Sequence, residues 1–181
     1  MKNIKTGKHT RVICAALGIF ALIAIFSPGL YTILWPIFHT RQVTLAGSKF
    51  IVPDGWVTTP KRWESSFNSL TMMRLPTAVF GMHGNYPTIV IYQRSNAKVE
   101  NSEALARWKA VAPGNFEARG YKIRSTKEFS SPKAIVCLEL SSAAGNPEST
   151  CFFESNGLMA DYYGDERAKD SLYNVIATAH F

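Results

Sequence analysis

The amino-acid sequence predicts an α+β domain, in which helices pack on an antiparallel sheet, preceded by one transmembrane helix at the N-terminus. Three observations lead to this prediction. An uncharged apolar segment occupies residues 12–38. After it, short segments rich in apolar and β-branched residues alternate with turn residues, which is typical of antiparallel strands. Two further segments, at residues 101–111 and 165–179, repeat apolar residues at helical spacing.

The charge distribution limits the kinds of partner. The chain has 181 residues and a formal net charge of +7, which at first suggests an anionic partner. Residues 1–11 hold four basic side chains and no acidic one, and the remaining 16 basic and 13 acidic residues form no basic run. A surface that binds nucleic acid normally gathers Lys and Arg on one face. We therefore expect no nucleic-acid partner and a solvated surface of mixed charge.

The segment at residues 12–38 predicts a single-pass anchor that follows a basic cytoplasmic tail at residues 1–11. It carries no formal charge, and about 20 apolar residues are enough for a helix to cross a bilayer. Pro28 and Gly29 predict a kink, and Trp35 suits the aromatic belt at the membrane–water boundary. A basic N-terminus stays in the cytoplasm, so residues 39–181 are expected to form an exported domain in the periplasm, held at the inner membrane.

A cleaved secretory signal is the alternative interpretation, because residues 12–26 have the length of the apolar core of such signals. The residues that follow contain no convincing small-residue cleavage site and stay apolar as far as Phe38. No cysteine stands just after the apolar core, so the pattern of a lipoprotein signal is also missing. We therefore expect the anchor to remain uncleaved.

Cys137 and Cys151 are the cysteines outside the apolar segment, and each lies in a predicted strand. A hairpin that closes symmetrically around Ala144 sets them directly opposite each other, where Cβ atoms lie about 4.5–5.5 Å apart. We expect a disulfide, which needs an oxidising compartment and so agrees with export. Two buried free thiols are the alternative. Two cysteines without further ligands make half a metal site, so neither a metal nor a cofactor is expected.

The other strands follow from local patterns. Residues 41–52 predict two short strands joined by a turn. Pro53, Asp54 and Gly55 predict a tight turn, after which Trp56 is expected to fill one end of the core. Further strands are expected at residues 70–74, 88–93, 121–129, 134–140, 149–153 and 158–163.

Two helices complete the domain. The first, at residues 101–111, has Ser102 as its N-cap and Trp108 on its core side, and it is expected to end at Pro113. The second, at residues 165–179, begins with Asp165 as its N-cap. Its apolar residues form one stripe that predicts a buried face, namely Ala168, Leu172, Val175, Ile176 and Ala179.

Three stretches together resemble the PsbP-like superfamily. They are the turn IVPDGW at residues 51–56, the strand TIVIY at 88–92, and the hairpin CFFESNGLMADYYG at 151–164 that leads into the last helix. The superfamily includes DcrB-type exported bacterial proteins, and adaptor chaperones of type VI secretion look similar in fold. The resemblance implies an α/β/α sandwich over residues 40–181 without a shared catalytic apparatus. Its members mostly bind other proteins or assist assembly, so it also implies a protein partner.

Few residues suggest chemistry. His83, in a Gly-flanked loop, can act as a general base, although a solvated loop histidine is the simpler interpretation. Trp63 beside Arg62 in a polar loop suits a recognition surface, because Trp and Arg are enriched at binding hot spots. Packing of the loop is the alternative for Trp63. Carboxylates cluster at Asp161, Asp165, Glu166 and Asp170, and the preference of a helix N-terminus for negative charge explains Asp165 and Glu166 without acid–base catalysis.

The sequence thus predicts a membrane-anchored, extracytoplasmic and non-catalytic protein-binding module, with Arg62, Trp63 and His83 as candidate binding residues. Two concrete versions are an immunity protein that neutralises a periplasmic toxin and an assembly factor for an envelope complex. An accessory subunit of a larger membrane complex would differ only in its partner. The alternative from another class is a small exported hydrolase that uses His83.

Overall fold

The structure is a computed structural model, which describes residues 13–19, 35, 37–58, 69–74, 87–93, 102–130, 133–155 and 157–181. The strands are β1 (Gln42–Leu45), β2 (Ser48–Ile51), β3 (Val57–Thr58), β4 (Ser69–Met73), β5 (Thr88–Gln93), β6 (Lys122–Phe129), β7 (Ile135–Ser141), β8 (Pro147–Phe153) and β9 (Leu158–Tyr163). The helices are α3 (Ser102–Ala118), the 3-10 helix η2 (Glu166–Ala168) and α4 (Asp170–Ala177).

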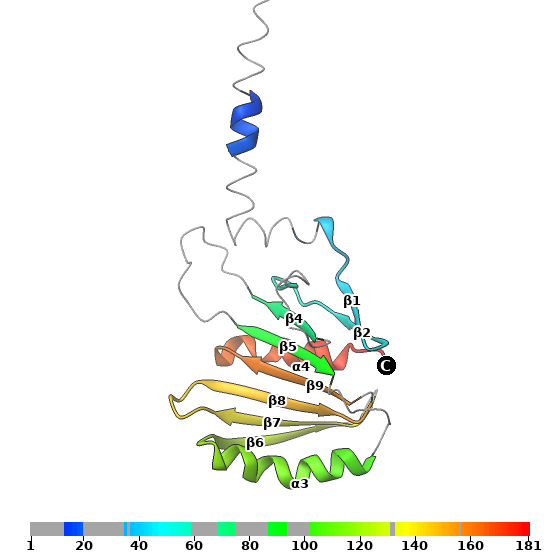
Figure 1. Cartoon of the computed structure of the whole chain (residues 1–181), viewed down its shortest axis with the longest axis vertical. Helices are drawn as coiled ribbons and strands as arrows, with labels where there is room; N and C mark the ends of the chain where they lie inside the picture. Colours follow the sequence, from blue (N-terminus) through cyan, green and yellow to red (C-terminus); the bar gives the residue numbers. More distant parts are fainter. Residues whose placement is uncertain are drawn as a thin grey trace, which may run out of the picture.

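The architecture is the expected mixture of helices and antiparallel strands. One sheet has seven strands in the order β3-β4-β5-β9-β8-β7-β6, and β1 pairs with β2 in a separate hairpin (Figure 1). All the pairings among the described strands are antiparallel. In the centre of the sheet β5 pairs with β9, although these strands are far apart in the sequence.

The hairpin of β7 and β8 has the expected register. Cys137 lies opposite Cys151, with their Cα atoms 4.0 Å apart, and a disulfide joins them. Both cysteines are fully buried. The predicted disulfide is thereby confirmed, and it holds the register of the two strands.

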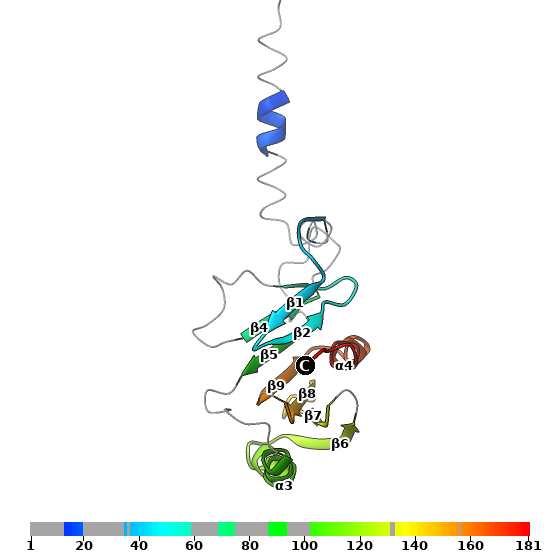
Figure 2. The ribbon, with the colours of Figure 1, turned by 90° about the vertical axis from the view of Figure 1, so that its right-hand side faces the viewer.

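Alternation along β7 divides its side chains between two faces of the sheet. Ile135 and Cys137 belong to the larger core cluster, which also contains the buried residues of α4. Leu138 and Leu140 belong to a smaller cluster with Ala112 of α3. The two helices therefore pack on opposite faces, which we call the α4 face and the α3 face, and Figure 2 shows them on different sides of the strands.

The α4 face carries the main core. The five residues of the predicted stripe, Ala168, Leu172, Val175, Ile176 and Ala179, are all buried. Asp165 is the predicted N-cap, because its Oδ1 accepts a hydrogen bond of 2.8 Å from the backbone N–H of Ala168. It caps η2, and the α-helix proper begins at Asp170. Trp56 is buried as expected, and its Nε1 donates a hydrogen bond of 3.1 Å to Ser171 Oγ.

Helix α3 is longer than predicted, because it continues through Pro113 to Ala118. Gly120, at a φ of +84°, ends it with two hydrogen bonds: its own N–H to Glu117 O and the Tyr121 N–H to Phe116 O. This is a Schellman motif, in which the Tyr121 ring also packs edge-on against Phe116. These contacts offset the loss of the backbone N–H that Pro113 lacks.

The interior of α3 also differs from the prediction. Ala112 is its only buried residue, and Trp108, expected in the core, is half-buried. The Trp108 ring stacks on Phe152 of β8, with the centroids 5.6 Å apart. The reason is that α3 lies along the surface of the sheet and covers only a narrow strip of it.

The N-terminal part of the domain joins its C-terminus. Lys49 of β2 and His180 form an isolated antiparallel bridge, with hydrogen bonds of 2.8 and 2.9 Å. Trp35, which we expected to suit the aromatic belt of a membrane, is buried and belongs to the main core cluster. The His39 ring stacks on it at 5.2 Å.

Most of the predicted anchor lies outside the described residues. Residues 13–19 are helical and exposed, and nothing is described between residues 20 and 34. Within the described ranges no helix has both the length and the apolar character needed to cross a membrane.

Replacing both disulfide cysteines, Cys137→Ala with Cys151→Ala, should lower the free energy of unfolding by about 3 kcal/mol, since the bridge restricts the unfolded chain. Urea unfolding followed by tryptophan fluorescence measures this change. Cys14→Ala is the matched control, because Cys14 is free and exposed. Unchanged stability of the double variant, or two free thiols in protein isolated from its native compartment, would contradict the assignment.

Candidate functional site

The candidate binding residues Arg62, Trp63 and His83 lie outside the described residues, so the structure neither brings them together nor separates them. The described parts of the chain contain no group of three or more side chains able to hold a metal ion. Two other polar clusters stand out, one on each face of the sheet.

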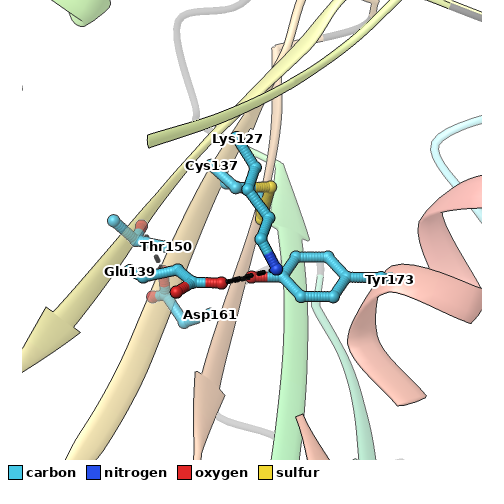
Figure 3. The surroundings of a disulfide bond; sticks show 7 residues. Lys127, Cys137, Glu139, Thr150, Asp161 and Tyr173 are labelled. Carbon is cyan, nitrogen blue, oxygen red and sulfur yellow. Dashed lines mark hydrogen bonds and ion pairs between the residues drawn. A yellow bond between two sulfur atoms is a disulfide. The ribbon is translucent and has the colours of Figure 1, made fainter. Parts of the chain in front are cut away.

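The cluster on the α4 face surrounds the buried carboxylate of Glu139. It accepts hydrogen bonds from Ser125 Oγ at 2.8 Å and from Tyr173 Oη at 2.6 Å. Lys127 Nζ lies 2.8 Å and Lys169 Nζ 3.3 Å from its oxygens. Figure 3 shows the Tyr173 hydroxyl directed at Glu139, beside the Lys127 ammonium group and the disulfide.

These contacts favour the ionised form of Glu139. Burial would raise its pKa, but hydrogen bonds from Lys127, Tyr173 and Ser125 outweigh burial and lower the pKa to about 2. Lys169 shows the reciprocal effect, because burial opposes its charge but Glu166 and Glu139 raise its pKa. The cluster joins β6, β7 and α4 with its charges fully paired, so we assign it a structural role.

The α3 face carries two adjoining cavities. The first has a volume of about 500 Å³ and follows α3, between Trp108, Val111 and Phe152. The second, of about 310 Å³, lies beyond the C-terminal end of the helix, and Phe116 and Arg119 line both. We call the second one the tyrosine cavity; its other lining residues are Tyr92, Tyr121, Leu140, Glu148, Ser149, Thr150, Met159, Asp161 and Tyr163.

Strand pairing explains how the tyrosine cavity forms. Asp161 of β9 lies between Val90 of β5 and Thr150 of β8, and Tyr163 lies opposite Glu148. Alternation directs these side chains to the α3 face, away from the main core. The main contacts of α3 are with β6, β7 and β8, so among the described elements the helix covers chiefly that side of the face and not the side of β5 and β9.

The acidic groups of the tyrosine cavity are held by hydroxyl groups. Thr150 Oγ1 donates a hydrogen bond of 2.6 Å to Asp161 Oδ1, visible in Figure 3, and Tyr163 Oη lies 3.4 Å from the other oxygen. Burial raises the pKa of Asp161, and the hydrogen bonds from Thr150 and Tyr92 offset this only in part. Burial and the nearby Asp161 also raise the pKa of Glu148.

Charge pairing distinguishes the two faces. Among the ion pairs of the described residues none includes Glu148 or Asp161, whereas Glu139 has two. Carboxyl groups whose ionised form is disfavoured, inside a cavity, are typical of functional sites. The tyrosine cavity is therefore the candidate functional site.

Asp161 lies near Asp165, Glu166 and Asp170 in the sequence, but the structure separates it from them. Asp165 does cap a helix, but Asp161 belongs to β9 and faces the opposite side from the buried Tyr162. The alternation in LMADYY contained this information, because an acid between Ala160 and Tyr162 must point away from the core. Pairing of β8 with β9 then brings it near Glu148, which no local pattern predicts.

The sequence matches no protein-family model, and no curated protein is significantly similar to it. Among solved structures, the solution structure of cyanobacterial PsbP (CyanoP) from Synechocystis sp. PCC 6803 is similar to this chain, with a TM-score of 0.43 and 11% identity. The similarity covers 79% of this chain and 94% of that one. It concerns the fold alone, and the predicted relation to DcrB-type proteins and secretion adaptors stays a prediction.

Glu139→Gln should lower the free energy of unfolding by roughly 3 kcal/mol at pH 7, because it leaves buried Lys169 with one carboxylate fewer. The stabilisation from Glu139 is present above its ordinary pKa of 4.5 and is lost as the pH falls toward about 2. The variant should therefore approach the wild type in stability in acid. Urea unfolding at several pH values checks this.

The control for this prediction is Glu128→Gln, because Glu128 forms a surface pair with Lys109 and is 56% exposed. Such pairs contribute between about 0 and 1 kcal/mol. Equal effects of the two substitutions would contradict the structural role of the Glu139 cluster.

Asp161→Asn should leave the free energy of unfolding unchanged or raise it by about 0.5–1 kcal/mol at pH 7, as is common where a functional group is removed. Asparagine keeps an acceptor for Thr150 and removes a charge that the fold disfavours. Thermal unfolding at pH 7 measures the change. A loss of stability as large as that of Glu139→Gln would make Asp161 a structural residue instead.

Proposed function

We propose that the chain is a membrane-anchored, extracytoplasmic protein-binding module that performs no covalent chemistry. The observation that carries this proposal is the pair of adjoining cavities between α3 and the sheet. The two cavities share Phe116 and Arg119, and their lining residues run from α3 to β9, where an extended segment of a partner would lie.

Exposed apolar side chains at both cavities support binding. Val111 of the first cavity is 51% exposed, and Tyr163 of the tyrosine cavity is 44% exposed. Aromatic residues that rim a concave surface are enriched in protein interfaces, because they supply large contact areas with little loss of conformational entropy. The half-buried Trp108 adds a third such side chain beside Val111.

Two features support an extracytoplasmic location. The disulfide between Cys137 and Cys151 persists in oxidising compartments and is rare in the cytosol. The basic residues 1–11 before the apolar segment at 12–38 favour an orientation that exports the domain. Both features are consistent with a domain held at the outer side of the inner membrane.

The finer proposals concern the partner. An immunity protein would bind a periplasmic toxin, and an assembly factor would bind a subunit of an envelope complex. A toxin gene beside the gene for this chain would favour the first. The hydrolase alternative depends on His83, and no observation favours it.

Val111→Arg should abolish capture of the partner when the full-length protein is purified from its native membranes after cross-linking, because a charge blocks the apolar strip beside α3. Ile51→Arg is the matched control, since Ile51 is also apolar and is 39% exposed on β2. Quantitative mass spectrometry of the captured proteins is the measurement. If both variants retain the same captured protein, it binds elsewhere and the proposed surface is wrong.

A further inference from the structure

We propose that the tyrosine cavity receives an arginine side chain of the partner protein. This inference rests on the proposed function, because the partner supplies the side chain. It assigns to the cavity a cationic, planar ligand, which the cavity would select by charge and by shape.

The cavity has room for such a side chain. Its volume of about 310 Å³ is roughly ten times the ~30 Å³ that one water molecule occupies in the liquid. The adjoining cavity along α3 gives the partner's backbone a place to lie, while one long side chain turns toward β9. Phe116 and Arg119 mark the passage between the two.

The walls suit a guanidinium group. Tyr92, Tyr121 and Tyr163 line the cavity, and aromatic faces attract cations, arginine most often. The Tyr121 ring is fixed in advance, because it packs edge-on against Phe116 with the centroids 5.7 Å apart and an angle of 90°. A wall held by the end of α3 loses little freedom when a ligand enters.

The charges suit it as well. Glu148 and Asp161 lack a basic partner among the described ion pairs, and their raised pKa values show that the site disfavours negative charge without a counter-ion. Arg119 is the one basic side chain among the residues that line the cavity, and it forms an ion pair with neither carboxylate among the described ion pairs. A guanidinium can donate two parallel hydrogen bonds to a carboxylate, which a lysine ammonium cannot do in the same planar geometry.

The lining argues for an organic cation over a metal ion. Calcium requires six to eight oxygen ligands and magnesium a regular octahedron. The tyrosine cavity offers two carboxyl groups among aromatic rings, Leu140 and Met159. The tyrosine cavity therefore suits the flat, delocalised charge of a guanidinium group better than a small metal ion.

The test titrates the full-length protein in detergent micelles with N-acetyl-arginine amide, and separately with N-acetyl-citrulline amide, which has the same shape without the charge. Backbone amide NMR follows the response. We expect signals of Glu148, Asp161 and Tyr163 to shift with the arginine probe, and the citrulline probe to bind at least tenfold more weakly. Asp161→Asn and Glu148→Gln should each weaken binding of the arginine probe at least fivefold.

The control variant is Glu117→Gln, because Glu117 is an exposed acid on α3 that lines neither cavity. It should bind the arginine probe as the wild type does. Equal binding of the two probes, no shift at the cavity, or unchanged binding by both Asp161→Asn and Glu148→Gln would overturn the inference.

The result separates this inference from the proposed function. If the arginine probe fails to bind but Val111→Arg still abolishes capture of the partner, the surface binds a protein by other contacts and only the arginine inference falls. If the arginine probe binds as expected but Val111→Arg still captures the same proteins as the wild type, the cavity does bind a guanidinium group. The proposed protein-binding function then falls.

Discussion

The register of β7 against β8 is the constraint on which the rest of the domain depends. The disulfide between Cys137 and Cys151 joins directly opposed residues, so the two strands cannot slip by one position without breaking it. A slip of one residue would exchange the two faces of a strand. The fixed register therefore keeps Ile135 and Phe153 in the main core against α4, and it keeps Leu138 and Thr150 on the α3 face.

The two faces use the same chemical group in opposite ways. On the α4 face, Glu139 is buried with two lysines and two hydroxyl donors, so its charge is stabilised and ties three elements together. On the α3 face, Asp161 is half-buried and has only hydroxyl groups as printed hydrogen-bond partners among the described residues, so its charge is disfavoured. The difference lies in whether a cation packs beside the carboxylate, and it separates a residue that supports the fold from one available to a ligand.

Local patterns predicted the features whose cause is local. The N-cap at Asp165, the apolar stripe of α4 and the turn before Trp56 each depend on residues within a few positions, and each was predicted correctly. The predicted end of α3 at Pro113 was wrong, because the helix continues through the proline and ends at the Schellman motif of Gly120. Trp35 was assigned from the apolar segment around it, whereas its burial depends on contacts with distant parts of the domain.

The sequence by itself determined the alternation of each strand, the pairing of the two cysteines and the faces of the last helix, because side-chain direction follows from a period of two or 3.6 residues. Only the tertiary structure decided which strands are neighbours. The tyrosine cavity needs Tyr92, Tyr121, Glu148 and Asp161 together, and this requires β9 to insert between β5 and β8. That order arises from long-range packing. The free energy gained by burying a whole sheet face outweighs the entropy lost when the chain between β5 and β9, which contains α3, β6, β7 and β8, is closed. No short stretch of sequence encodes this balance.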